Sequence, residues 1–256
     1  MVTKIPQRRA PINIQDTPAV SLSSRRIVLL GKGGVGKSSS GNTILGQKEF
    51  ESQSSTPSVT SECSEAHATV SGRSVSVVDT PGLFDTEMNP EKLMMKIARS
   101  VYLSSPGPHA FLIVLRVDDR FTKQEQQFPQ MIEMMFGQEV LKYSIILFTR
   151  GDHLYGVSVE ELIEENCALR ALVDQCGGRY HVFNNRDRRN TGQVNDLLQK
   201  IDTMIEQNGG GHYNNLRTDA LRKRQKEEKR ELQEETESAG PRRTKPVRES
   251  DRCTIL

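Results

Sequence analysis

The sequence predicts an α/β protein in which residues 25–208 of the 256-residue chain form a mostly parallel central sheet flanked by helices. Two observations predict this fold class. Short apolar runs alternate with longer segments of helical periodicity from Arg26 to Gln207. Several of the runs are continuous in Val, Ile and Leu, which is typical of strands that are covered on both faces.

The elements follow from this alternation in chain order. We expect strands at 26–30, in a stretch ending at Val70, and at 74–79, 110–117, 144–149 and 179–183. We expect helices directly after the glycines of residues 31–36 and at 90–104, 123–136, 159–175 and 193–207. Parallel neighbours in such a sheet are joined by right-handed crossovers.

The two ends of the chain differ from this core in composition. Residues 1–24 are polar, lack the apolar centre of a secretory signal and have Val2 where myristoylation requires glycine, so we expect a disordered leader. Residues 209–256 are rich in charge, and two interpretations stay open: a solvated helical or disordered tail, and a coiled-coil partner helix.

The formal charge of +2 gives no reason to expect nucleic acid as a partner. The four cysteines form no C-x-x-C pair, so we expect them to be reduced thiols in a cytoplasmic protein.

A glycine-rich loop follows the first strand and opens the first helix, which is the context that a phosphate-binding loop requires. Its spacing is Gly31-x-x-x-x-Gly36-Lys37-Ser38. In such a loop the backbone N–H groups and the helix N-terminus surround the phosphates, the lysine reaches the β- and γ-phosphates, and the serine hydroxyl binds Mg²⁺. The nucleotide contacts predicted in this segment are Gly31, Lys32, Gly33, Gly34, Val35, Gly36, Lys37, Ser38 and Ser39.

Asp79 and Gly82 form the next motif, at the end of the strand 74–79. In the pattern D-x-x-G the carboxylate holds Mg²⁺ through water, and the glycine N–H senses the γ-phosphate. We therefore expect Ser38 and Asp79 to contribute to one magnesium site.

The strand 144–149 ends in Thr149-Arg150-Gly151-Asp152, which is similar to the guanine-reading motif [N/T]-K-x-D with arginine in place of lysine. Guanine presents two adjacent donors, N1–H and the C2 amino group, that one carboxylate accepts, whereas adenine has an acceptor at N1 and no amino group at C2. Asp152 therefore favours GTP and GDP as ligands. The stem of Arg150 can cover the base and its guanidinium can stack on it.

Lys32 leaves an alternative open. A lysine in front of paired glycines also marks ATPases with a deviant loop, in which it contacts the phosphates bound to the other subunit. That alternative gives no role to an acid at Asp152, so we place Lys32 at the entrance of the loop. A contact with phosphate across a dimer is left open.

Four segments together, 31–46, 79–85, 106–126 and 148–152, resemble the GIMAP family of immunity-associated GTPases over residues 25–207. The segment 106–126 makes the resemblance specific, because ordinary small GTPases have nothing like it between their Mg²⁺ and base motifs. The resemblance implies a P-loop GTPase (G domain), related to the septins and the chloroplast import-receptor GTPases, with GTP or GDP and Mg²⁺ bound. It also implies nucleotide-dependent homodimers or oligomers, heterodimers with family members, and membrane-bound scaffolding in immune-related signalling.

Two further nucleotide contacts follow from the resemblance. Thr60 matches the threonine that binds Mg²⁺ in the GTP state, with Thr56 and Ser58 as alternatives nearby. Asn184, followed by Asn185, matches a position near the guanine O6. A pair of turn-forming asparagines is an equally good interpretation of these two residues.

Unaided hydrolysis is expected to be slow. GTP hydrolysis needs an oriented water, commonly held by a glutamine just past D-x-x-G, and a leucine and a phenylalanine occupy that position here. Lys37 is the residue that we expect in a catalytic role, and His109, Arg116 or Arg120 of a second subunit are candidates for the missing group. Two functions remain: a GTPase switch activated by dimerisation, and a GTP-dependent assembly scaffold with negligible turnover.

The last four residues, CTIL, form a C-a-a-X pattern that predicts geranylgeranylation of Cys253. One prenyl chain anchors weakly, and basic residues in the preceding segment are expected to add attraction to anionic lipid. We therefore expect a peripheral protein on a cytoplasmic membrane face.

Overall fold

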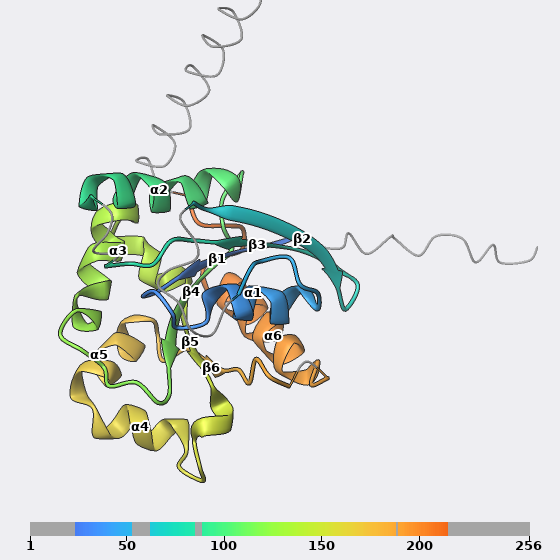
Figure 1. The fold of residues 1–256 in the computed structure, drawn as a ribbon. Coiled ribbons are helices and arrows are strands. Elements are labelled where there is room, and N and C mark those ends of the chain that lie inside the picture. Colours follow the sequence, from blue (N-terminus) through green and yellow to red (C-terminus); the bar gives the residue numbers. More distant parts are fainter. Residues whose placement is uncertain (1–23, 53–61, 85–88, 188, 215–256) are drawn as a thin grey trace, which may run out of the picture.

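The computed structural model of the chain describes residues 24–52, 62–84, 89–187 and 189–214. These residues form a six-stranded sheet with helices on both faces (Figure 1). The strands lie in the order β2-β3-β1-β4-β5-β6. The β2–β3 pair is antiparallel, and every other neighbouring pair in this sheet is parallel. The predicted α/β fold with a mostly parallel sheet is confirmed.

Most elements lie within one or two residues of the predicted ranges. The strands are β1 (Arg25–Leu30), β2 (Ser64–Val70), β3 (Arg73–Asp79), β4 (Ala110–Arg116), β5 (Ser144–Thr149) and β6 (Tyr180–Val182). The helices are α1 (Lys37–Leu45), α2 (Pro90–Leu103), α3 (Phe128–Phe136), α4 (Val159–Glu165), α5 (Cys167–Gln175) and α6 (Gly192–Gln207). Short 3₁₀ turns lie at Glu125–Gln127, Gln138–Tyr143 and Gly151–His153. No helix in the described ranges has both the length and the apolar character needed to cross a membrane.

The sheet separates two hydrophobic cores. In β1, Ile27 and Leu29 belong to one core and Val28 and Leu30 to the other, as the two-residue period of a strand requires. Helices α1 and α6 cover one face, and α2 to α5 lie on the other (Figure 1). Because both faces are buried, β1, β4 and β5 each carry a continuous apolar run of four or more residues.

The single helix predicted over 159–175 is wrong. α4 ends at Glu165 and α5 begins at Cys167, with Asn166 in an extended conformation between them (φ −120°, ψ 98°). The Asn166 side-chain oxygen accepts hydrogen bonds from the N–H groups of Ala168 and Leu169, both at 3.1 Å. Asn166 is therefore the N-cap of a second helix, a position that asparagine favours.

The helix predicted from Lys123 also begins later, at Phe128. The buried Glu125 carboxylate accepts hydrogen bonds from the N–H and the hydroxyl of Thr122, both at 2.8 Å. These bonds hold a turn, and the 3₁₀ segment Glu125–Gln127 joins that turn to α3.

The packed domain continues to Tyr213, past the composition change at residue 209. The Tyr213 side chain is fully buried, its N–H donates to the Pro108 carbonyl at 2.8 Å, and its hydroxyl donates to the Phe136 carbonyl. Its ring meets the rings of Phe111 and Tyr143 edge to face. The remainder of the charged tail and nearly all of the predicted leader lie outside the described residues.

Candidate nucleotide-binding site

The predicted phosphate loop joins the carboxyl end of β1 to the amino end of α1. Gly34 (φ 77°) and Gly36 (φ 96°) adopt left-handed conformations that favour glycine. A Cβ atom at Gly31 would lie 2.6 Å from the Val114 carbonyl oxygen, so the loop lies directly on β4. This strand-loop-helix arrangement presents backbone N–H groups and a helix N-terminus to anions.

Lys37, the first residue of α1, folds back over the loop. Its Nζ donates to the carbonyl oxygens of Gly31 at 3.0 Å and Lys32 at 2.9 Å, and the residue is 7% exposed. The ammonium group is therefore held against the loop that would surround the phosphates, as its predicted role requires. Lys32 is partly exposed and contributes its backbone carbonyl to this arrangement.

Ser38 and Asp79 meet beside the loop. The Ser38 hydroxyl donates to Asp79 Oδ2 at 2.5 Å, and Asp79 is buried at the end of β3. A hydroxyl and a carboxylate are hard oxygen ligands that fit Mg²⁺, which keeps several waters and takes further oxygens from phosphates. The described residues contain no group of three or more His, Cys, Asp or Glu side chains that could hold a metal, so the fit depends on this pair together with a nucleotide. Thr60 and its alternatives lie outside the described residues.

The D-x-x-G turn packs directly on the phosphate loop. A Cβ atom at Gly82 would lie 2.7 Å from the Gly33 nitrogen and 2.9 Å from its Cα. The N–H of Leu83 donates to the Gly31 carbonyl at 2.9 Å, and Leu83 pairs with Lys32 in an isolated parallel bridge. The two predicted phosphate-sensing segments are therefore in backbone contact.

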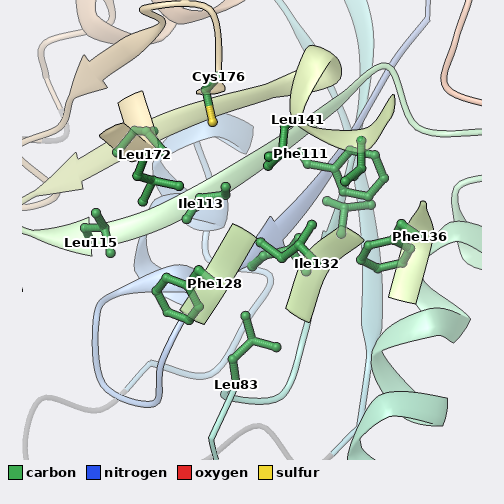
Figure 2. Close-up of a cluster of buried hydrophobic side chains, with 14 of the residues drawn as sticks. Leu83, Phe111, Ile113, Leu115, Phe128, Ile132, Phe136, Leu141, Leu172 and Cys176 are labelled. Carbon is green, nitrogen blue, oxygen red and sulfur yellow. The ribbon is translucent and has the colours of Figure 1, made fainter. Parts of the chain in front are cut away.

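The two residues after Gly82 are anchored in the core. Leu83 is 1% exposed and lies beside Phe128 and Ile132 of α3 (Figure 2). The Phe84 ring stacks on Phe128 with a centroid distance of 5.3 Å. Both side chains are used in apolar packing, and neither carries a group that can orient a water.

Thr149 connects the phosphate loop to the base-reading segment. It is 1% exposed at the end of β5, and its hydroxyl lies 2.7 Å from the Val35 carbonyl and 3.2 Å from that of Leu115. Its side chain therefore supports the loop backbone, because the hydroxyl lies within hydrogen-bonding distance of buried carbonyls. The part of Thr149 in nucleotide binding stays a prediction.

Asp152 lies on the 3₁₀ turn after β5, as a base-reading acid should. Its Oδ2 is 3.1 Å from Nη1 of Arg186, a side chain that is 75% exposed, and 3.6 Å from Nε2 of His153. Arg150 adopts a left-handed conformation (φ 59°), and its Nη1 lies 2.8 Å from Oδ2 of Asp118. The guanidinium of Arg150 is therefore turned to a different carboxylate from the one that would read the base.

Asn184 and Asn185 follow β6 and face different partners. Asn184 Oδ1 accepts a hydrogen bond from the Arg186 N–H, and its own N–H donates to Gln193, both at 3.0 Å. The Asn184 side-chain oxygen is therefore used within its own turn, and its backbone N–H is bonded to the start of α6. Asn185 donates to the Ser40 hydroxyl at 3.1 Å and accepts from the Thr43 hydroxyl at 2.9 Å, so it is Asn185 that contacts α1.

Sequence reasoning missed two of these contributors. Asp118 and Arg186 match no position of a nucleotide-binding motif, and the fold brings them to the site through tertiary contacts. The one available signal is that each follows a predicted strand, at the carboxyl edge where α/β sheets bind ligands.

His109, one candidate for a group supplied to another subunit's site, is buried, which counts against that role. It is buried before the amino end of β4, at the opposite edge of the sheet from the phosphate loop, and its Nδ1 accepts from the N–H of Arg26 at 3.0 Å. Burial and the neighbouring Arg26 lower the pKa of His109 to about 3. The Arg116 guanidinium is paired with Asp118, and Arg120 is exposed.

Comparisons with known proteins show the family of this chain. The sequence profile of the AIG1 family matches residues 25–236. The human GTPase IMAP family member 8 is 34% identical over 224 residues, which cover 86% of this chain and 34% of that protein. The immune-associated nucleotide-binding protein 8 of Arabidopsis thaliana is 35% identical over 222 residues, which cover 84% of this chain and 63% of that protein. The chain thus spans about a third of the human relative and less than two thirds of the plant one.

A solved structure shares the fold. Toc33 from Arabidopsis thaliana in complex with GDP and Mg²⁺ superposes with a TM-score of 0.56 and 18% identity, over 71% of this chain and 84% of that one. The sheet and its flanking helices therefore share the fold of that domain. Since the family profile covers most of the chain and curated relatives exceed 30% identity, the chain belongs to the AIG1 family.

Proposed function

We propose that this AIG1-family domain binds GTP and GDP together with Mg²⁺. The observation that carries the proposal is the position of Asp152: its carboxylate stands at the carboxyl edge of the sheet that also carries the phosphate loop and the Ser38–Asp79 pair. An acid at this place accepts the two donors of guanine and repels the acceptor of adenine. The names of the relatives, and the GDP and Mg²⁺ in the Toc33 crystal, support the same ligands.

Each residue then has a defined part in phosphate binding. The loop N–H groups and the Lys37 ammonium would offset the negative charge of the β- and γ-phosphates. Ser38 and Asp79 would hold Mg²⁺, which would supply positive charge against the phosphates. The Gly82 N–H, packed against Gly33, would respond to the γ-phosphate and move with the loop.

We further propose that hydrolysis is slow in the monomer and rises on dimerisation. Support comes from Leu83 and Phe84, whose packing on α3 leaves no side chain to orient water at that position. Among proteins with a solved structure of similar fold, dimerization is important for the GTPase activity of the chloroplast translocon components atToc33 and psToc159. The alternative is an assembly scaffold that binds GTP with negligible turnover. The packing of Leu83 and Phe84 on α3 is equally compatible with this alternative.

Two measurements test these proposals. Titration calorimetry with GDP, a non-hydrolysable GTP analogue and ADP should show tight guanine nucleotide binding and no ADP binding. Preference for adenine would contradict the proposal and favour the deviant-loop ATPase alternative, with Lys32 as the residue to study. GTPase activity per molecule should then rise with protein concentration for a dimer-activated switch, and stay near zero for a scaffold.

Membrane attachment through Cys253 stays a proposal, because this residue lies outside the described ones. A peripheral protein in immune-related signalling is the setting that we propose for it. In fractionated cells, the wild type should be found with the membranes, and the Cys253→Ser variant should be found in the soluble fraction. Equal membrane association of the two would contradict lipid anchoring at this cysteine.

A further inference from the structure

Asp118, two residues past the end of β4, is paired with three basic side chains. Its Oδ1 lies 2.9 Å from Arg116 Nε, and its Oδ2 lies 3.0 Å from Arg116 Nη2. The same Oδ2 lies 2.8 Å from Arg150 Nη1 and 3.0 Å from His153 Nδ1. Arg150 and His153 flank Asp152 in the segment that would read guanine, so one carboxylate joins that segment to residues 106–126, the segment that makes the family resemblance specific.

The register of the sheet explains why these groups meet. Arg116 of β4 pairs with Thr149 of β5 in a parallel ladder, and the Val117 N–H donates to the Thr149 carbonyl at 3.2 Å. Asp118 and Arg150 are the residues that leave this ladder next, side by side at the carboxyl edge. Arg150 leaves it in a left-handed conformation, which is unfavourable for a residue with a Cβ atom and needs contacts to hold it.

Asp118 contacts Arg150 and His153 more closely than Asp152 does. The Arg116 hydrogen bond, followed by that of Arg150, holds the pKa of the Asp118 carboxyl well below its usual range, so this group is charged at neutral pH. It draws the Arg150 guanidinium and the Nδ1 edge of His153 to itself. The Asp152 carboxylate contacts the exposed Arg186 side chain and, at the longer distance of 3.6 Å, His153 Nε2. A bound base can replace an exposed partner of this kind.

We propose that Asp118 is a positioning residue for guanine recognition, which holds Arg150 and His153 so that the Asp152 carboxylate meets both donors of the base. The proposal rests on the proposed guanine nucleotide binding and adds to it a residue outside the known nucleotide motifs. It assigns a residue of the segment 106–126 to base selectivity. Asp119, the next residue, lies 3.5 Å from Arg116 Nε and has no such contact with Arg150 or His153 in the described structure.

The test compares GDP with inosine diphosphate, whose base keeps N1–H and lacks the C2 amino group. A loop displaced from its place loses the two-donor contact, so Asp118→Asn should weaken GDP binding by about five- to fiftyfold, the range expected when a charged hydrogen-bonding partner is removed. Inosine diphosphate makes one fewer contact with Asp152, so its affinity should fall less than that of GDP. The ratio of GDP affinity to inosine diphosphate affinity should therefore be smaller in the variant than in the wild type. Asp119→Asn, the matched control, should keep both affinities within about twofold of wild type.

A second variant tests whether Asp118 acts through Arg150. Arg150→Gln removes the partner from the other side of the pair, and the double variant with Asp118→Asn should lose less GDP affinity than the sum of the single variants predicts. Thermal unfolding of each variant shows whether it is folded. If Asp118→Asn does not fold, the test depends on Arg150→Gln alone, through its ratio of GDP affinity to inosine diphosphate affinity compared with that of the wild type. Equal loss of GDP and inosine diphosphate binding, or additive single effects, would overturn the positioning role and leave guanine binding intact. A wild type that binds ADP as well as GDP would overturn both.

Discussion

Thr149→Val removes the buried hydroxyl that ties the base-reading segment to the phosphate loop, with almost no change in volume. The hydroxyl lies 2.7 Å from the Val35 carbonyl and 3.2 Å from the Leu115 carbonyl, and the residue is 1% exposed. A methyl group in its place leaves buried carbonyl oxygen without this donor, at a cost of about 1–3 kcal/mol in the free energy of unfolding. For a domain of this size that is about 2–4 °C in Tm for each kcal/mol.

Urea unfolding of the wild type and Thr149→Val measures this cost directly, and GDP titration measures the effect on the loop. Thr203→Val is the matched control, because the Thr203 hydroxyl donates to the Gln199 carbonyl at 3.1 Å on the exposed side of α6, where water can replace it. We expect the control to change the unfolding free energy by less than about 0.5 kcal/mol. A Thr149→Val protein as stable as the control, with unchanged GDP affinity, would refute the supporting role of this hydroxyl.

Three further predictions test other contacts of the site and the core. Arg186→Ala should tighten GDP binding by about two- to fivefold in calorimetry, because an exposed ion pair on Asp152 no longer competes with the base; unchanged or weaker binding would speak against competition. Gly82→Ala should remove the difference in affinity between GDP and a GTP analogue, because the added Cβ meets the backbone of Gly33 at 2.7 Å; a preserved difference would show that the turn tolerates the methyl group. The pKa of His109 is lowered from 6.5 to about 3, so the unfolded chain binds a proton first and stability should fall as pH falls from 6.5. In urea unfolding at several pH values, the free energy of unfolding of His109→Gln should fall less steeply below pH 6.5 than that of the wild type. An equally steep fall in both proteins would show that His109 does not cause it.

The hydrophobic pattern was sufficient to predict the strands and most helices. β1, β4 and β5 each carry a continuous apolar run because helices bury both of their faces, and such runs stand out in a sequence. The phosphate loop, Asp79 and Asp152 were predictable because phosphate, Mg²⁺ and guanine each require particular groups at fixed spacing. These are local requirements, and a single sequence displays them.

The features that escaped prediction depend on contacts between distant segments or on one local cap. Asn166 resembles an ordinary polar residue inside a helical pattern, and its role as an N-cap appears only when the chain bends there. Tyr213 is an isolated aromatic residue after three glycines, and its burial depends on a site formed by Phe111 and Tyr143. Asp118 is likewise defined by partners about 30 residues away that the sheet register brings next to it.

Asp152→Asn provides the most direct test of the central claim that this domain reads guanine. An asparagine amide can donate to a carbonyl at C2 and accept from N1–H, which is the pattern of xanthine, whereas the C2 amino group of guanine meets a donor. Calorimetry with GDP and xanthosine diphosphate should show that the variant loses GDP affinity by about a hundredfold and gains affinity for xanthosine diphosphate. A variant that binds GDP as tightly as the wild type would contradict the claim that Asp152 recognises the base.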